Sequence, residues 1–379
     1  PPMAAGLFGY LGYDMVRQME DLPEPNSDPI GIPDAVMVRP TLIVVFDAVK
    51  DTITIITPVR PQSGVDAKAA LARATERLSA VVENLDRPLN KSVADADAGA
   101  IDVPSTSNTT PAEYKDMVLK AKEYIAAGDI FQVVLSQRFE APFALSPFSL
   151  YRALRRTNPS PYLYFLDFGS FAVAGSSPEI LVRVRGDHVE IRPLAGTRPR
   201  GDTPHEDQAL EAELLADPKE RAEHVMLIDL GRNDLGRISE TGSVEVSDSF
   251  VVERYSHVMH IVSQVQGTAR EGLSYMDVLK ATFPAGTLSG APKVRALEII
   301  QELEPYKRNI YGGAIGWIGW WGDADTAIAI RTAVIHGGRL HVQAGAGIVY
   351  DSDPAAEWEE TMNKGRALFR AVAQAAKGL

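Results

Sequence analysis

The sequence predicts an α+β fold built on antiparallel β-sheets. β-Branched runs at 41–46 and 52–57 are separated by a short polar segment, which is typical of a β-hairpin. The pair Gly337-Gly338 joins two further strand-like runs, 326–336 and 339–349, in the same way. Helices are interspersed with these hairpins, which favours an α+β fold over a Rossmann-type sheet.

Composition narrows the classes of function. The chain has 379 residues, 45% of them hydrophobic, as in folded globular proteins. Its net charge of -12 argues against nucleic-acid binding. The absence of cysteine excludes disulfides, iron–sulfur clusters and a cysteine nucleophile, and it is compatible with a cytoplasmic location. We expect no membrane anchor, because Asp323 and Asp325 interrupt the most apolar glycine-rich stretch before it reaches the roughly 20 residues that span a bilayer.

Three parts are expected along the chain. Residues 1–90 contain the first hairpin and an amphipathic helix, and they read as the remainder of an N-terminal subdomain whose natural start is missing, since the chain opens on Pro1-Pro2. Residues 91–109 form a linker rich in Ser, Thr, Asn, Asp and Pro. Residues 110–379 form the main domain.

The main domain opens with a well-marked helix. Thr110 is the N-cap, Pro111 follows it, Glu113 completes a capping box, and the helix ends near Gly128. Further helices are predicted at about 207–230, 274–281, 291–303 and 354–376, and strands at 130–139, 162–168, 171–174, 179–184, 188–192, 250–265, 314–320, 326–336 and 339–349.

Two pairs of glutamates are candidate metal ligands. Glu220 and Glu223, and likewise Glu357 and Glu360, lie three residues apart on predicted helices, so each pair projects from one helix face. Two facing pairs would form an all-oxygen site that suits Mg²⁺. A single helical pair is more often solvated surface charge, and spacing alone does not decide between these roles.

Other residues indicate a site for an anionic small molecule. Arg331 lies in an apolar run, where a cation needs a carboxylate partner from the protein or from a ligand, and we favour a ligand. The small residues of 343–347 either expose backbone amides to a carboxylate or reflect a bulge or close packing. His257 and His260 are expected on opposite faces of a strand, so one of them could act as a lone acid or base. The segment 286–293 lacks the P-loop spacing, which argues against nucleotide binding.

Five segments in order resemble the signatures of the chorismate-utilising enzyme family, and within it the first components of anthranilate synthases: 194–201, 220–234, 258–263, 286–296 and 343–347. The resemblance covers essentially the whole chain. It implies a sandwich of antiparallel sheets with helices packed outside, and it makes 110–379 the chorismate-binding catalytic domain.

The resemblance also assigns ligands. It implies that Glu223 and Glu360 bind Mg²⁺ directly, that Glu220 and Glu357 do so through water, and that the ion holds the ring carboxylate of chorismate. The residues implied to bind chorismate are Gly196, Thr197, Thr287, Tyr311, Arg331, Gly345, Ala346 and Gly347.

The implied reaction joins chorismate and ammonia to give anthranilate and pyruvate through 2-amino-2-deoxyisochorismate, the first committed step of tryptophan biosynthesis. Glu179 matches the general acid for loss of the C4 hydroxyl, and His260 matches the residue tied to pyruvate elimination. The resemblance also implies that Gln132 and Thr197 belong to the catalytic residues. Relatives that activate water carry lysine where this chain has Gln132, and many aminodeoxychorismate synthases carry a nucleophilic lysine where it has Ala195. Aminodeoxychorismate synthase component I is therefore the alternative activity, and a non-catalytic binding protein is disfavoured because the site residues are all retained.

Partners are implied as well. Family members take ammonia from a separate glutamine amidotransferase subunit, as heterotetramers, and this chain has no cysteine with which to hydrolyse glutamine itself. Pro161, Tyr162 and Leu163 resemble part of the family's tryptophan feedback site. The Leu-Leu-Glu-Ser element of that site is absent from this sequence, so we expect tryptophan inhibition to be weakened or lost.

Overall fold

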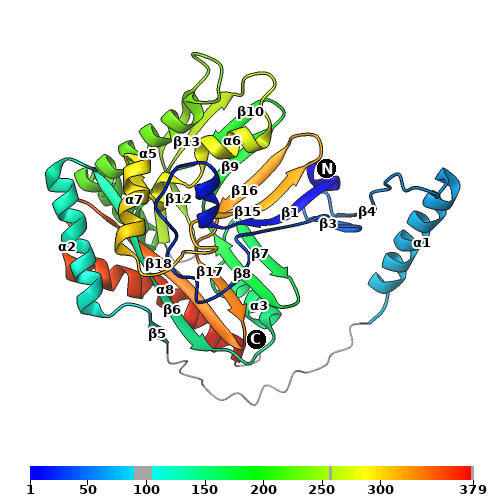
Figure 1. The fold of residues 1–379 in the computed structure, drawn as a ribbon, viewed down its shortest axis with the longest axis horizontal. Helices are drawn as coiled ribbons and strands as arrows, with labels where there is room; N and C mark the ends of the chain where they lie inside the picture. The colour runs from blue at the N-terminus through cyan, green and yellow to red at the C-terminus, as the bar shows by residue number, and fades with distance from the viewer. Residues whose placement is uncertain (89–104, 256–257, 377–379) are drawn as a thin grey trace.

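Two large antiparallel sheets organise the molecule (Figure 1). The structure is a computed structural model, and it describes residues 1–88, 105–255 and 258–376. The larger sheet has nine strands, in the order β11-β13-β10-β9-β16-β15-β1-β2, with β12 paired to β13. The smaller has seven, in the order β14-β6-β18-β17-β8-β7, with β5 paired to β6. The α+β class with antiparallel sheets is confirmed.

The elements have the following bounds. The larger sheet comprises β1 (Gly6–Leu11), β2 (Ala35–Val38), β9 (Ile180–Arg185), β10 (His188–Ile191), β11 (Leu194–Pro199), β12 (Glu245–Arg254), β13 (Val258–Thr268), β15 (Ala314–Gly319) and β16 (Ala324–Ile328). The smaller sheet comprises β5 (Thr106–Ser107), β6 (Gln132–Pro142), β7 (Tyr162–Asp167), β8 (Phe171–Ser177), β14 (Gly290–Ala291), β17 (Thr332–His336) and β18 (Arg339–Ile348). A separate hairpin pairs β3 (Ile43–Asp47) with β4 (Thr52–Ile56). The helices are α1 (Ala67–Leu85), α2 (Pro111–Ala127), α3 (Pro147–Thr157), α4 (Pro204–Ala216), α5 (Pro218–Gly236), α6 (Tyr275–Thr282), α7 (Lys293–Leu303) and α8 (Pro354–Ala376), with 3₁₀ turns η1 (Pro2–Ala4), η2 (Tyr13–Gln18) and η3 (Gly286–Leu288).

The two faces of the smaller sheet are covered by different partners. On β8, Val173 belongs to a buried cluster that also contains Tyr10 and Ile315 of the larger sheet. Its neighbour Ala174 belongs to a second cluster, formed with α3 and α8. This alternation follows from the period of two along a strand. The inner face therefore packs on the other sheet, and the outer face is covered by helices.

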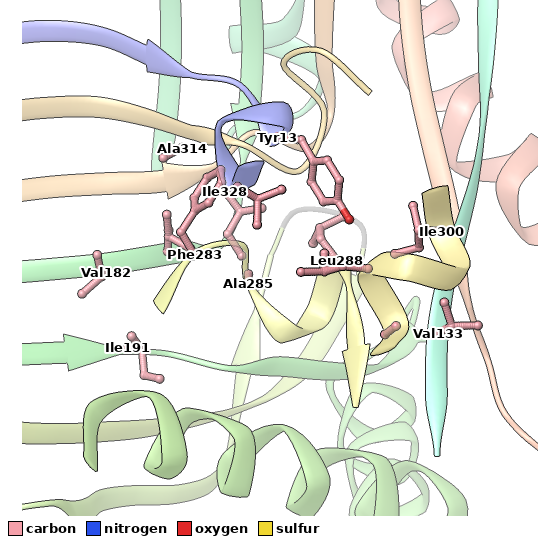
Figure 2. Close-up of a cluster of buried hydrophobic side chains, with 14 of the residues drawn as sticks. Tyr13, Val133, Val182, Ile191, Phe283, Ala285, Leu288, Ile300, Ala314 and Ile328 are labelled. Atoms are coloured by element: carbon pink, nitrogen blue, oxygen red, sulfur yellow. The ribbon is translucent and has the colours of Figure 1, made fainter. Parts of the chain in front are cut away.

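The largest buried cluster lies where α6, α7 and η3 meet the sheets (Figure 2). Phe283, Leu288 and Ile300 come from the segment that runs from α6 to α7, and they pack with Val182 of β9 and Val133 of β6. Because this segment contacts strands of both sheets, it fixes η3 in the space between them.

Several local predictions are confirmed. The side chain of Thr110 accepts a hydrogen bond from the Glu113 amide, and the Glu113 carboxylate accepts one from the Thr110 amide. Gly128 ends α2 with φ of 83°. Gly337 and Gly338 both have positive φ and connect β17 to β18.

Three predicted elements are interrupted. The helix predicted at 207–230 is two helices, because Pro218 cannot continue α4 and instead occupies the first turn of α5. The strand predicted at 250–265 is the antiparallel pair β12 and β13. The strand predicted at 326–336 breaks at Arg331, whose φ is 50°, and its two halves belong to different sheets.

Some elements were not predicted. β1 and β2 extend the larger sheet: β1 pairs with β15, and β2 pairs with β1 at the edge. α3 and β11 were also missed. The predicted linker falls largely on 89–104, and His257 on 256–257, both outside the described residues. Among the helices of the described residues, none is long and apolar enough to span a membrane.

Candidate active site

Two helices that carry glutamate pairs begin in the same way. α5 starts at Asp217-Pro218, and the Asp217 carboxylate accepts hydrogen bonds from the amides of Lys219 and Glu220. α8 starts at Asp353-Pro354, and the Asp353 carboxylate accepts from the amides of Ala355 and Ala356. These caps fix where each helix begins. Each glutamate pair therefore lies within the first two turns, where the helix dipole stabilises negative charge.

The two glutamate pairs influence each other electrostatically. Burial raises the pKa of Glu223, and the carboxylates of Glu220 and Glu360 raise it further. Burial also raises the pKa of Glu357, with Glu360 adding to the shift. Within the described residues, Glu223 has neither a hydrogen bond nor an ion pair. A partly buried carboxylate among like charges is costly unless a cation joins it.

Two basic side chains lie against this acidic cluster. Lys364 Nζ lies 2.7 Å from Glu360 Oε1 and donates to the carbonyl of Gly345 at 2.9 Å. Its charge also lowers the pKa values of Glu179, Glu223 and Glu357. Arg198 Nη1 donates to Glu220 Oε1 at 3.2 Å. Across the described ranges, no three His, Cys, Asp or Glu side chains are close enough together to hold a metal ion as they stand.

The glycines of β18 leave room beside two polar side chains. A Cβ atom on Gly345 would lie 2.7 Å from the Tyr311 hydroxyl oxygen, and one on Gly347 would lie 2.5 Å from Gln132 Nε2. The same Cβ on Gly347 would lie 4.0 Å from Glu223 Oε1. Ala346, between them, is fully buried. β18 therefore runs beside Glu223. Gly345 and Gly347 have to be glycine because Tyr311 and Gln132 lie too close to leave room for a Cβ atom.

Arg331 lies at the point where the chain passes from one sheet to the other. β16 belongs to the larger sheet and β17 to the smaller. Burial lowers the pKa of Arg331, opposed by Tyr255 and Glu179. In the described part of the chain its guanidinium has neither an ion-pair nor a hydrogen-bond partner. A largely buried cation in that state suits an anionic ligand.

Glu179 is a buried acid. It joins β8 to β9 and is 6% exposed. Burial raises its pKa to about 8, although a hydrogen bond from Thr287 and the charges of Arg331 and Lys364 act in the opposite direction. Thr287 Oγ1 donates to Glu179 Oε1 at 3.0 Å. The carboxyl is therefore mostly protonated at neutral pH and can donate a proton.

His260 is a buried base. Its Nδ1 lies 2.9 Å from the carbonyl oxygen of Gly196 and 3.1 Å from Thr197 Oγ1. A carbonyl only accepts, so Nδ1 carries the proton and Nε2 keeps a free lone pair. Burial lowers the pKa of His260 to about 4, and Nε2 is buried without a hydrogen-bond partner among the described residues. The imidazole is therefore neutral and can accept a proton.

The structure brings most of the predicted residues together. Gly196 links the imidazole to the glutamates, because a Cβ atom there would lie 3.2 Å from Glu220 Oε2. The predicted feedback residues Pro161, Tyr162 and Leu163 lie on or beside β7, where the Tyr162 hydroxyl donates to Asp325. Sequence analysis missed Lys364 and Arg198. The spacing of Lys364, one turn after Glu360, was the signal available for it.

Comparison with known proteins is consistent with this geometry. The family model described as chorismate binding enzyme matches residues 1–370. Anthranilate synthase component 1 of Cereibacter sphaeroides is 55% identical over 378 residues, which cover 99% of this chain and 75% of that protein. The Pseudomonas putida protein of the same name is 54% identical over 379 residues, covering 99% of this chain and 76% of the relative.

A solved structure agrees in fold. Anthranilate synthase component I from Streptococcus pneumoniae TIGR4 superposes with a TM-score of 0.88 at 44% identity, covering 96% of this chain and 80% of that one. The chain belongs to the chorismate-binding enzyme family, among the anthranilate synthase component 1 proteins.

Proposed function

We propose that this chain converts chorismate and ammonia into anthranilate and pyruvate, the first committed step of tryptophan biosynthesis. The observation that carries the proposal is that one site combines a protonated Glu179 with Arg331, whose guanidinium has no partner in the described part of the chain. The first can donate a proton to a leaving hydroxyl, and the second can hold a carboxylate. Relatives named anthranilate synthase component 1, at 50–55% identity, support the same activity.

The roles of the residues follow from their protonation states. Arg331 and the Tyr311 hydroxyl hold the enolpyruvyl carboxylate, and the backbone at 345–347 lies along the ring carboxylate. Glu179 gives its proton to the C4 hydroxyl, which leaves as water while ammonia adds at C2. The free Nε2 of His260 then takes the C2 proton, pyruvate leaves and the ring becomes aromatic. Thr197 and Gly196 hold the imidazole in the tautomer that this step needs.

Mg²⁺ fits the oxygen-only ligands present. We propose that Glu223 and Glu360 bind it directly and that Glu220 and Glu357 support it through water. The partly buried carboxylate of Glu223, which lies among like charges and has no partner among the described residues, supports this proposal. When bound, the ion would neutralise these carboxylates and hold the ring carboxylate of chorismate.

Two neutral side chains support ammonia as the nucleophile. Gln132 is buried beside Gly347, at the position where water-activating relatives carry lysine. Ala195 is buried in β11, so it offers no amine for a covalent adduct. A glutamine amidotransferase subunit as the source of ammonia, a heterotetrameric assembly, a cytoplasmic location and weakened inhibition by tryptophan are parts of the same proposal. The name "component 1" of the relatives supports a second component.

The test is product identification. The chain is incubated with chorismate, ammonium chloride and Mg²⁺, and the products are separated and measured. We expect fluorescent anthranilate and an equal amount of pyruvate. Accumulation of 4-amino-4-deoxychorismate, which retains its enolpyruvyl group, would instead assign the aminodeoxychorismate synthase activity.

A further inference from the structure

A fully buried ion pair lies directly behind the glycine strand. Glu304 follows the C-terminus of α7 and Arg308 follows one turn later, and their side chains are 3% and 1% exposed. Arg308 Nε donates to Glu304 Oε2 at 2.8 Å, and Nη2 donates to Glu304 Oε1 at 2.5 Å. Replacing a buried ion pair with apolar residues is often neutral or stabilising, so this one needs a reason beyond stability.

Among the described residues, every remaining hydrogen bond of the two side chains goes to an element that borders the site. Arg308 donates to the carbonyl of Leu288 at the end of η3 and to that of Val134 on β6. Glu304 accepts from the amide and the hydroxyl of Ser136, also on β6. In the sheet, Val134 lies opposite Gly347 and Ser136 lies opposite Gly345. The ion pair is therefore hydrogen-bonded to β6, which pairs with the part of β18 that contains Gly345 and Gly347.

Arg308 also packs against Tyr311. Its guanidinium lies 5.6 Å from the centre of the Tyr311 ring, and the Tyr13 ring packs against it at 4.6 Å. The amide of Tyr311 donates to the carbonyl of Arg308 at 3.1 Å. The Tyr311 hydroxyl in turn lies against the backbone of Gly345, since a Cβ atom on Gly345 would lie 2.7 Å from its oxygen. Arg308 thus contacts the ring of Tyr311 and is also hydrogen-bonded to β6. β6 pairs with β18, the strand that the Tyr311 hydroxyl touches at Gly345.

We propose that Glu304 and Arg308 are positioning residues for chorismate binding: they hold the Tyr311 hydroxyl in register with Gly345 and Gly347. This inference rests on the proposed function of the site. Neither side chain touches substrate. Arg308 acts through Tyr311, and Glu304 acts by orienting Arg308 and Ser136.

The test is a double-mutant cycle between Arg308 and Tyr311. Arg308→Lys keeps the charge but removes the forked hydrogen bonds to Leu288 and Val134. We expect Arg308→Lys and Tyr311→Phe each to raise KM for chorismate about tenfold with a smaller change in kcat, because each loses one positioned contact. The double variant should match Tyr311→Phe alone within about twofold. Effects that multiply, or an unchanged KM in Arg308→Lys, would overturn the proposal.

Two further variants distinguish a loss of positioning from a loss of folding. Glu304→Gln keeps an acceptor for Ser136 but removes the charge, and Glu304→Met with Arg308→Met removes the pair without leaving an unpaired charge. Both should remain folded with raised KM, and wild-type KM in the folded double variant would overturn the proposal. Arg295→Lys is the matched control, since Arg295 also bonds acidic partners and packs on a tyrosine ring, but on the surface. Its KM should not change.

Calorimetric binding of chorismate separates this inference from the proposed reaction. If the parent binds chorismate but forms a different product, the reaction assignment fails, and the cycle is measured on the dissociation constant instead. If the parent forms anthranilate and the cycle is additive, the positioning role fails while the reaction stands.

Discussion

Burial gives Glu179 and His260 opposite roles in proton transfer. It raises the pKa of Glu179 to about 8 and lowers that of His260 to about 4, because burial disfavours the charged form of either group. At neutral pH the carboxyl therefore carries a proton and the imidazole does not. The site holds an acid and a base that are both uncharged before substrate arrives.

Glu179 predicts a specific pH dependence. The acid must be protonated to act, so kcat at saturating free ammonia should fall as pH rises through about 8. Glu179→Gln should lose about 10²–10⁴ in kcat and lack this alkaline limb. Steady-state rates across the pH range, with ammonia corrected for its own ionisation, provide the measurement. A Glu179→Gln enzyme with the parent's rate would rule out the acid role.

We expect Arg331 to lower the stability of the free protein and to strengthen the binding of substrate. Its side chain is a mostly buried cation that forms no ion pair among the described residues, and Glu179 acts on it only from a greater distance. Arg331→Met should raise the thermal midpoint without substrate, since the desolvated charge is gone. The same change should lower kcat/KM about a hundredfold or more through loss of a charged hydrogen-bonding partner. Differential scanning calorimetry and kinetics check both parts, and a lower midpoint would show that the cation stabilises the free protein.

Residue types were predicted better than residue environments. The glutamate pairs, Glu179, His260 and Arg331 could be named from sequence because the resemblance identifies their positions. Their pKa directions depend on burial and on neighbours from other elements, such as Lys364 beside Gly345, and no local pattern encodes those contacts.

Helix starts determine where the glutamates project. The start of α8 at 354 was predicted, but the Asp217-Pro218 pair was overlooked as a helix start, although an N-cap aspartate before proline is a recognisable signal. Because this boundary was missed, α4 and α5 were predicted as one helix. Glu220 was therefore expected in the middle of a helix, whereas it lies in the first turn of α5. Arg331 was placed inside a strand for a related reason: the run is uniformly apolar, and nothing in its period reveals the passage between sheets.

The cap of α5 gives a stability prediction. Asp217→Ala removes the acceptor for two backbone amides and should lower the free energy of unfolding measurably. Asp217→Asn keeps an acceptor and should stay near the parent. Chemical denaturation followed by circular dichroism measures both, and equal stability of Asp217→Ala and parent would contradict the capping role.

At the scale of the molecule, the site is formed where two sheets and the segment from α6 to α7 meet. The α+β class was predictable because hairpins and helices leave local signatures. The order of strands was not, since β1 pairs with β15 more than 300 residues later in sequence. That pairing brings the N-terminal segment against the loop that leads to Tyr311, where the Asp14 carboxylate accepts from the Asn309 amide at 3.0 Å.

Asp14 makes this junction sensitive to pH. Burial raises its pKa to about 6, so between about pH 4 and 6 the folded state binds more protons than the unfolded state. Its contribution therefore destabilises the fold as pH rises through this window. Asp14→Asn should remove this destabilisation, which is on the order of 2 kcal/mol. The thermal midpoint of the variant should therefore rise relative to that of the parent between pH 4 and pH 7. A difference that stays constant with pH would show that Asp14 is not buried as described.

The most direct test of the whole arrangement is anthranilate formation as a function of Mg²⁺, for the parent and two single variants on α8. Glu360→Gln removes a proposed ligand, whereas its neighbour Glu359→Gln changes an exposed carboxylate paired only loosely with Arg366. We expect the parent and Glu359→Gln to form anthranilate with the same dependence on Mg²⁺, and Glu360→Gln to lose activity by about a hundredfold or more. Full activity of a folded Glu360→Gln, or activity of the parent that does not respond to removal of Mg²⁺, would contradict the proposed site.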